Sequence, residues 1–180
     1  AIIFNFVKNR MNFNDRYGYG CLSGVKKAYQ DKTGNVAEIN LMLASMLRFA
    51  GVNANPVLIS TRSNGIALYP SRSAFNYVIV GIELDNQIIL LDATSKNSIA
   101  DILPTRDLNW YGRIIRENGT SASVNLMPKD ISNDKVVVMA KIDETGIVEG
   151  KLRDQYFDYN AYFFRENNSK LSDESQIEKL

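Results

Sequence analysis

The chain has 180 residues, of which 45% are hydrophobic, so it can bury one ordinary globular core with an appendage, or two small units. Its 21 lysine and arginine residues nearly balance 20 acidic residues, and no basic cluster exceeds a dipeptide, so a nucleic-acid partner is not expected. The longest apolar runs, such as residues 77–80 and 88–91, fall far short of the roughly 20 residues that cross a bilayer. No membrane span is therefore expected in this segment.

Two residue types limit the chemistry that is open to the chain. Cys21 is the single cysteine, and histidine is absent. One cysteine excludes an internal disulfide and a multi-thiolate metal site. The absence of histidine removes the usual general base and the commonest metal ligand. We therefore expect neither a metal nor a cofactor.

Apolar residues with helical spacing open the chain. Residues 2–11 and 23–32 have this spacing, without the charged start and cleavage site of a signal peptide. The clearest helix follows at about residues 36–50, where apolar residues recur at three- and four-residue spacing, and it should be central and mostly buried. Asn35 and Glu38 have the spacing of a capping box at its start.

Three segments rich in Val, Ile and Leu come next, at residues 56–61, 75–84 and 87–92. They predict strands, and Asp85-Asn86 predicts a tight hairpin between the second and the third. The stretch at residues 62–73 contains Asn-Gly and Pro and predicts a surface loop over the sheet. A helix followed by an antiparallel sheet is the expected arrangement.

The character of the sequence changes after Pro104, and we place a domain boundary near Asn109. Two more hairpins are predicted, around Asn118-Gly119 and around residues 143–146, followed by a polar helix in residues 156–180. The predicted domains are a core at residues 1–108 and a β-rich C-terminal segment at residues 109–180 that ends in a helix. The predicted fold class is α+β, with a central helix packed on an antiparallel sheet.

Three motifs resemble those of transglutaminase-like proteins, which have a papain-like fold. KTGNVAEINL at residues 32–41 resembles the core-helix motif, in which Gly-x-Cys opens the helix. FNYV at residues 75–78 resembles the strand motif that normally ends in Asn-His-Val, and LLDAT at residues 90–94 resembles the strand with the catalytic aspartate. The ordered set covers residues 24–96, and the tail resembles the β-rich segment that follows this domain in large exported proteins of Bacteroidetes-type bacteria.

The resemblance places the positions of the catalytic triad at Val36, Tyr77 and Asp92. In active members a thiol at a helix N-terminus is paired with an imidazole that a carboxylate holds. Here Val36 stands in the place of the nucleophile and Tyr77 in the place of the base, so that only Asp92 remains. A valine has nothing to attack with, and a tyrosine with a reference pKa of about 10 is a poor proton acceptor. The site is therefore expected to be degenerate and the chain not to be an enzyme.

The leading hypothesis is a binding or scaffolding module within a larger exported bacterial protein, in the periplasm or at the cell surface. The resemblance implies a groove for an unidentified peptide, protein or glycan ligand, and contacts with other domains of the parent chain. One alternative is a hydrolase or acyltransferase that uses a nucleophile outside the family pattern, such as Cys21 or a serine. A structural spacer is a third possibility.

Several residues have competing interpretations. Cys21 is interpreted as a half-buried thiol rather than a displaced nucleophile, since no histidine activates it. Asp92 either caps the turn that follows it or contacts Tyr77, which the predicted hairpin places nearly opposite. Trp110 and Tyr111 either pack two units together or form a stacking platform for a ligand. The remaining arginines of interest, Arg62, Arg72 and Arg106, are scattered and predict solvated surface charges.

Overall fold

The structure is a computed structural model that describes residues 1–68, 71, 73–85, 87–169, 171 and 175. The described chain is α+β, as predicted, and it divides into two compact units, Ala1–Lys129 and Asp130–Leu180. Each unit is described by itself. Within the described residues, no helix is long and apolar enough to span a membrane.

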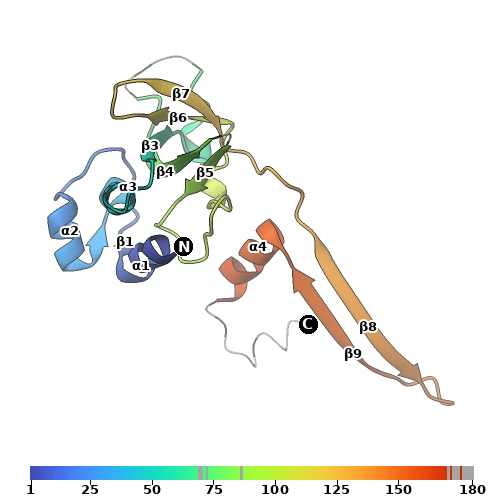
Figure 1. The fold of residues 1–180 in the computed structure, drawn as a ribbon. Coiled ribbons are helices and arrows are strands. Elements are labelled where there is room, and N and C mark those ends of the chain that lie inside the picture. Colours follow the sequence, from blue (N-terminus) through green and yellow to red (C-terminus); the bar gives the residue numbers. More distant parts are fainter. Residues whose placement is uncertain (69–70, 72, 86, 170, 172–174, 176–180) are drawn as a thin grey trace. The chain divides into compact units, whose positions relative to one another are not determined.

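A five-stranded antiparallel sheet organises the first unit (Figure 1). Its strands are β3 (Ala54–Ile59), β4 (Tyr77–Leu84), β5 (Gln87–Leu91), β6 (Tyr111–Ile115) and β7 (Ser121–Asn125). They lie in the order β5-β4-β3-β6-β7. The predicted antiparallel sheet and the hairpin around Asn118-Gly119 are confirmed, with Gly119 in the left-handed region at φ +81°. Asn86 in the predicted turn between β4 and β5 lies outside the described residues.

The pairing of β6 explains why the chain divides later than the boundary predicted at residues 108 and 109. Strand β6 pairs with β3, aligning Val57 with Ile114 and Leu58 with Arg113, and β7 continues the sheet from β6. The hairpin after residue 109 therefore completes the first sheet instead of starting a new unit. This pairing joins strands more than 50 residues apart, and the local sequence pattern does not contain that information.

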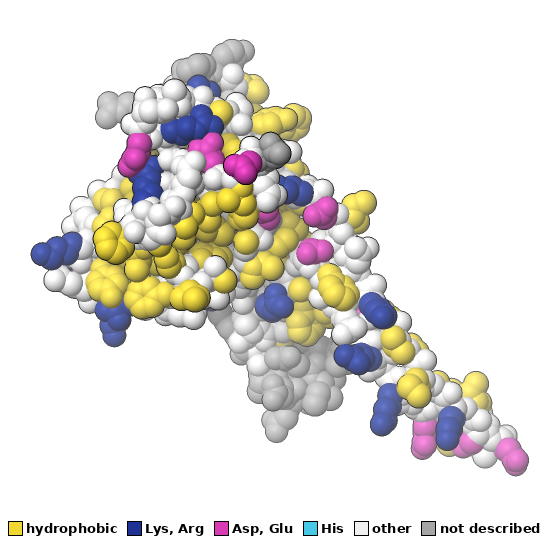
Figure 2. Space-filling model, in the orientation of Figure 1, with side chains coloured by type: hydrophobic (Ala, Val, Ile, Leu, Met, Phe, Trp, Pro, Cys, Tyr) yellow, Lys and Arg dark blue, Asp and Glu magenta, His cyan; other side chains and the backbone are white. Residues whose placement is uncertain are grey.

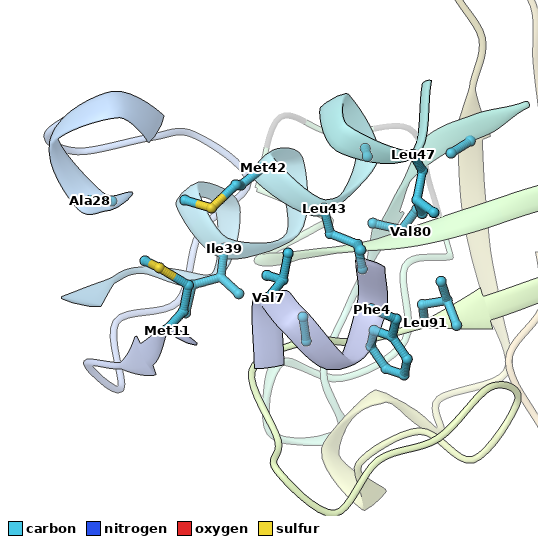
Figure 3. Close-up of a cluster of buried hydrophobic side chains, with 13 residues drawn as sticks. Phe4, Val7, Met11, Ala28, Ile39, Met42, Leu43, Leu47, Val80 and Leu91 are labelled. Carbon is cyan, nitrogen blue, oxygen red and sulfur yellow. The ribbon is translucent and has the colours of Figure 1, made fainter. Parts of the chain in front are cut away.

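Three helices lie together on one side of this sheet (Figure 1). They are α1 (Ile2–Arg10), α2 (Val25–Asp31) and α3 (Val36–Phe49), with a short parallel pair of strands, β1 (Asn12–Phe13) and β2 (Thr33–Gly34), between them. Helix α3 is central, as predicted: Ile39 and Leu43 are fully buried in one cluster with Val80 of β4 (Figure 3). Burial of large apolar side chains of this kind contributes roughly 1.5–3 kcal/mol each.

Both ends of α3 follow the predicted signals. At the N-terminus, the Asn35 side chain accepts a hydrogen bond from the Glu38 amide at 2.9 Å, and Glu38 accepts one from the Asn35 amide at 2.9 Å. At the C-terminus, Gly51 has φ +80° and its amide donates to the Arg48 carbonyl at 2.9 Å. A glycine takes this left-handed conformation without steric cost, so the helix ends there.

The opposite face of the sheet also carries buried side chains. Val80 faces α3, so its neighbour Ile79 faces the other way, and the register aligns Ile79 with Val57 and Ile114 across β4, β3 and β6. All three side chains are fully buried. Gly112 belongs to this face and lies so close to β3 that a Cβ atom would come within 2.9 Å of the Leu58 carbonyl oxygen.

The second unit consists of a two-stranded ribbon and a helix. Strands β8 (Asp134–Ile142) and β9 (Val148–Tyr156) pair antiparallel around the predicted turn, in which Gly146 has φ +85°. Helix α4 (Asp158–Asn168) follows, so the predicted second hairpin and terminal helix are confirmed, although the helix ends at Asn168. Figure 2 shows hydrophobic and basic side chains side by side on the visible face of the ribbon.

Candidate functional site

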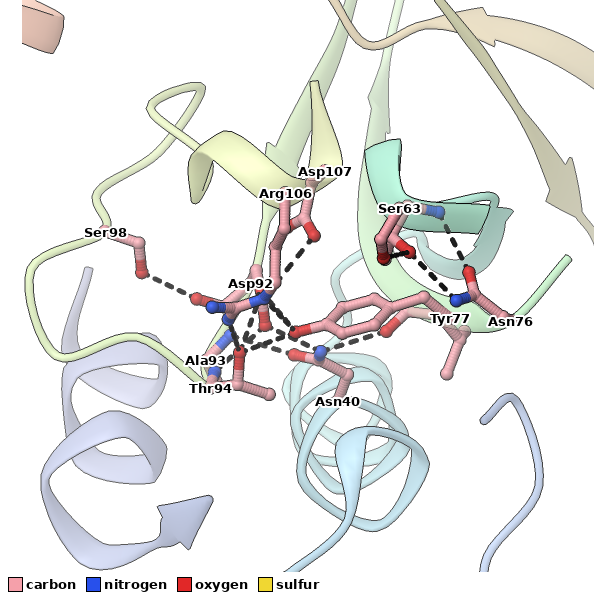
Figure 4. Close-up of polar contacts among 12 residues, drawn as sticks. Asn40, Ser63, Asn76, Tyr77, Asp92, Ala93, Thr94, Ser98, Arg106 and Asp107 are labelled. Carbon is pink, nitrogen blue, oxygen red and sulfur yellow. Dashed lines mark hydrogen bonds and ion pairs between the residues drawn. The ribbon is translucent and has the colours of Figure 1, made fainter. Parts of the chain in front are cut away.

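Strand β4 and the end of β5 bring Tyr77 and Asp92, two of the three predicted triad positions, together in the first unit (Figure 4). Val36 is the first residue of α3, Tyr77 is the first residue of β4, and Asp92 directly follows β5. All three side chains are fully buried. The Tyr77 hydroxyl donates a hydrogen bond to Asp92 Oδ2 at 2.9 Å.

Both interpretations of Asp92 therefore hold. One carboxylate oxygen accepts the Tyr77 hydroxyl, as the predicted contact requires. The other accepts the Thr94 amide at 2.9 Å, so Asp92 also caps the turn that follows β5. The carboxylate joins the strand β4 to this turn.

Two further residues bind Asp92, and sequence reasoning missed both. Asn40, one turn into α3, donates to Asp92 Oδ1 at 2.8 Å, and it also donates to the Val78 carbonyl and accepts from the Ala93 amide. Thr94 donates its hydroxyl to Asp92 Oδ2 at 2.8 Å. Asn40 and Thr94 stand within the quoted motifs, but a buried asparagine or threonine has no spacing signal that distinguishes it from a surface residue.

Arg106 is the main correction to the sequence-based description, which placed it on the solvated surface. It lies on the short 3-10 helix η2 (Thr105–Asp107), and its guanidinium donates to the Tyr77 hydroxyl oxygen at 3.1 Å and to Thr94 at 2.6 Å. The guanidinium also forms an ion pair with Asp92 at 3.3 Å. Arg106 therefore supplies the positive charge beside Asp92.

Burial by itself would lower the pKa of Arg106, but Tyr77, Asp92 and Asp107 around it raise that pKa above its ordinary value, so the guanidinium stays charged.

Of the other predicted surface arginines, Arg62 donates to the Leu108 carbonyl at 2.8 Å, and Arg72 lies outside the described residues. The path of the chain after β5, rather than local sequence, directs Arg106 inward.

The environment of Tyr77 makes its hydroxyl a hydrogen-bond donor rather than a base. Burial raises the pKa of Tyr77 well above its ordinary value, and the negative charge of Asp92 is the next largest cause. The phenol is therefore neutral throughout the physiological pH range. To act as a base the group would first have to lose its own proton, which it donates to Asp92, and the raised pKa opposes that loss.

Asp107 is the second buried carboxyl group of the site. It is fully buried and lies beside Arg106, with Nε to Oδ1 at 3.8 Å (Figure 4). No donor in the described part of the chain forms a hydrogen bond to either of its oxygens. Burial raises the pKa of Asp107 well above its ordinary value, and the negative charge of Asp92 is the next largest cause.

The start of α3 is covered by the loop between β1 and α2. The Val36 amide, at the N-terminus of α3, donates to the Arg16 carbonyl at 3.2 Å. The Tyr17 ring meets the Tyr77 ring edge to face, with centroids 5.2 Å apart and an interplanar angle of 84°. Tyr77, Asp92 and Val36 are thus closed off from solvent.

Cys21 lies in the same loop and is exposed, not half-buried as predicted. Partial desolvation, and then the negative charge of Glu38, raise the pKa of its thiol. The thiolate, which is the nucleophilic form, is therefore disfavoured at neutral pH. Glu38 itself accepts hydrogen bonds from the amides of Ser23 and Gly24, which fixes the loop that carries Cys21.

An open groove of about 620 Å³ lies on the face of the sheet that carries Leu58 and Arg113. We call it the sheet groove; its lining includes Tyr19, Leu58, Leu68, Phe75, Tyr111 and Arg113. Arg113 has no carboxylate partner within the described residues. A second depression, of about 640 Å³, is lined by charges that are already paired, such as Arg48 with Glu117.

Tyr111 lines the sheet groove whereas Trp110 does not, and both residues lie within the first unit and not at its boundary with the second. Within the described residues, no group of three or more Asp, Glu, Cys or His side chains is placed to hold a metal ion.

The fold and the site define an α+β domain in which a central helix and an antiparallel sheet enclose a buried Tyr-Asp-Arg cluster. No family model matches the chain, and no curated protein matches it. Among solved structures it is similar to the crystal structure of a "putative protease" from Parabacteroides distasonis, with 14% identity and a TM-score of 0.44. The alignment covers 78% of this chain and 29% of that one.

Proposed function

We propose that the chain is a catalytically inactive transglutaminase-like domain that serves as a binding or scaffolding module within a larger exported protein. One observation carries the proposal. The residue in the place of the catalytic base, Tyr77, is fully buried, and its hydroxyl is bonded to Asp92 and Arg106. An acyl-transfer site needs an accessible nucleophile within hydrogen-bond reach of a base.

The properties of the possible nucleophiles also support an inactive site. Val36 is a hydrocarbon, and the Thr94 hydroxyl is buried and bonded to Asp92 and Arg106. The raised pKa of Cys21 and the absence of a histidine to activate it weaken the alternative that this thiol drives a hydrolase or acyltransferase. A role in binding or support remains, and it uses surfaces outside the closed cluster.

The sheet groove is the surface that best fits a binding role. Its volume of about 620 Å³ lies in the usual range for ligand sites, and Tyr19, Phe75 and Tyr111 provide aromatic faces. An extended peptide, a segment of a protein or a glycan can stack on such faces. Export to the periplasm or cell surface, and contacts with neighbouring domains, rest on the family resemblance alone.

An activity assay tests the inactive part of the proposal. We expect no amine incorporation into dimethylcasein and no release from fluorogenic amide substrates, alongside an active transglutaminase and a papain-like protease as positive controls. The wild-type chain and its Cys21→Ala variant should give the same blank rate. Turnover that persists through purification and is lost in Cys21→Ala contradicts the proposal and supports the hydrolase or acyltransferase alternative.

A binding screen tests the sheet groove separately. The probes are a displayed peptide library and an array of bacterial cell-surface glycans, and the readout is capture by the immobilised chain. We expect Tyr111→Ala to remove capture, because Tyr111 lines the groove. Trp110→Ala is the matched control, since Trp110 is a neighbouring exposed aromatic that does not line the groove. Equal capture by both variants would exclude the sheet groove as the binding site.

A further inference from the structure

The buried cluster contains one more acidic group than basic groups. Asp92 and Asp107 are both fully buried, and each lies beside the single guanidinium of Arg106. Tyr77, the other titratable group in contact, is neutral. Two carboxylates that share one buried site and one cation cannot both stay ionised at low cost, because desolvation and mutual repulsion both oppose the second charge. One of the two carboxyl groups must hold a proton.

The distribution of hydrogen-bond donors decides which group holds it. Asp92 accepts from Tyr77, Thr94, Asn40 and Arg106, so its charge is well stabilised. Asp107 receives no hydrogen bond from any described donor. A protonated Asp107 is itself a donor, and Asp92, which lies beside the same guanidinium, is the carboxylate toward which it can donate. The proton belongs on Asp107, where it supplies the missing donor between the two carboxyl groups.

We propose that Asp107 and Asp92 form a proton-holding carboxyl pair that acts as a latch. While Asp107 is protonated, the pair keeps η2 docked against the ends of β4 and β5. When Asp107 ionises, a second buried negative charge appears beside Asp92 and η2 loosens. This latch does not depend on the proposed binding role, because it follows from the burial and the contacts of the pair.

The structure also connects η2 to the wall of the sheet groove. Directly after η2, the Leu108 carbonyl accepts from Arg62 at 2.8 Å. The Asn109 side chain donates to the carbonyls of Ser60 and Gly65, at 3.0 and 2.8 Å. The loop that these bonds hold continues to Leu68, which lines the groove. Loosening of η2 therefore releases the bonds that fix this loop.

The direction of the pH effect follows from the charged groups around Asp107. These are Asp92 after β5, Tyr77 on β4, Arg106 on η2, and Arg62, which reaches the next residue from the 3-10 helix η1 (Arg62–Asn64). The pKa of Asp107 is raised in the folded chain, whereas in the unfolded chain it is about 3.9. The stabilisation is thus complete below about pH 3.9 and is lost as the pH rises through the folded-state pKa of Asp107.

The test compares the full chain with Asp107→Asn, which keeps the shape and offers a permanent N–H donor to Asp92 but cannot ionise. Asp85→Asn, at an exposed carboxyl, is the matched control. Urea unfolding is measured from pH 4 to pH 8. In the window between the two pKa values of Asp107, the unfolding constant of the wild type should rise by up to about tenfold per pH unit relative to Asp107→Asn. The wild type and Asp85→Asn should show the same dependence on pH.

Two measurements on the unmodified chain keep the proposal testable if Asp107→Asn fails to fold. The carboxyl ¹³C resonance of Asp107 should titrate well above the ordinary range for an aspartate, and amide exchange at Leu108 and Asn109 should accelerate as it titrates. An Asp107 resonance that titrates at about 3.9 or below overturns the proton-holding pair. A raised titration with unchanged amide exchange at both residues overturns the latch.

Discussion

At the scale of single residues, the buried cluster shows how a carboxylate stays satisfied without an imidazole. Tyr77 contributes a neutral donor and Arg106 contributes the positive charge, two roles that a single protonated imidazole combines. The charge of Asp92 is thereby stabilised, while the raised pKa of Tyr77 keeps its hydroxyl protonated and unable to act as a base at neutral pH. Burial of the cluster then makes each contact important for stability.

We predict that Tyr77→Phe destabilises the first unit by about 1–3 kcal/mol, because the ring still fills its site while Asp92 loses a donor and Arg106 loses an acceptor. The measurement is the free energy of unfolding in urea. Tyr111→Phe is the control, since Tyr111 is 57% exposed. If Tyr77→Phe unfolds like the wild type, the hydrogen bond to Asp92 contributes nothing to stability.

At the scale of elements, the N-terminus of α3 is held by more than its own cap. Glu38 closes the capping box on Asn35 and also accepts the amides of Ser23 and Gly24 from the preceding loop. The desolvation of this buried carboxyl alone would raise its pKa, but the hydrogen bonds from these amides lower it. A single side chain therefore ties the central helix to the loop that covers the cluster.

We predict that the charge of Glu38 makes a contribution to stability that disappears in acid. Its folded-state pKa is lowered, so the contribution is complete above the unfolded value of about 4.3 and is lost as the pH falls through the folded-state pKa. Glu38→Gln preserves the capping geometry without the charge. The difference in unfolding free energy between the wild type and Glu38→Gln should shrink between pH 6 and pH 3. A difference that does not change with pH would show that the charge has no role.

A second prediction at this scale concerns the contact between β3 and β6. Gly112→Ala should destabilise the first unit by about 1–3 kcal/mol, because the new Cβ would lie 2.8 Å from Ile59 Cγ2 and 2.9 Å from the Leu58 carbonyl oxygen. Thermal unfolding measures the effect. Gly20→Ala is the matched control, since nothing lies within 4 Å of its added Cβ. Equal melting temperatures for the two variants would contradict the close approach of β6 to β3.

At the scale of the whole molecule, the division of the chain follows strand pairing. Strands β6 and β7 complete the sheet of the first unit, and the side chain of Ile114 in β6 is fully buried. The second unit begins at Asp130, with a ribbon that pairs only within itself in the described chain. An independent folding unit should therefore end at Lys129 rather than at residue 108.

We predict that a chain ending at Lys129 folds cooperatively, whereas a chain ending at Leu108 does not. The shorter chain lacks β6, so one edge of β3 is left unpaired, and the buried face formed by Val57 and Ile79 becomes exposed. Near-ultraviolet circular dichroism and urea unfolding distinguish the two. Cooperative unfolding of the shorter chain would support the boundary that the sequence predicted.

Much of the fold was determined by local sequence. The capping box of Asn35 and Glu38, the apolar repeat of α3, and the turns at Gly119 and Gly146 each predicted an element that the structure contains. The contact between Tyr77 and Asp92 was also predictable, because a tight turn sets the register of the two strands that it joins. These features depend on residues that are close together in the chain.

Only the tertiary structure decided the pairing of β6 with β3, the inward turn of Arg106, and the burial of Asp107. Each brings together residues that the chain separates by a long connection, and periodicity and turn signals carry no information on such contacts. An arginine and an aspartate at adjacent positions are typical of a surface turn. Their charge, protonation and role depend on burial, because removal of water makes each charge costly unless partners compensate for it.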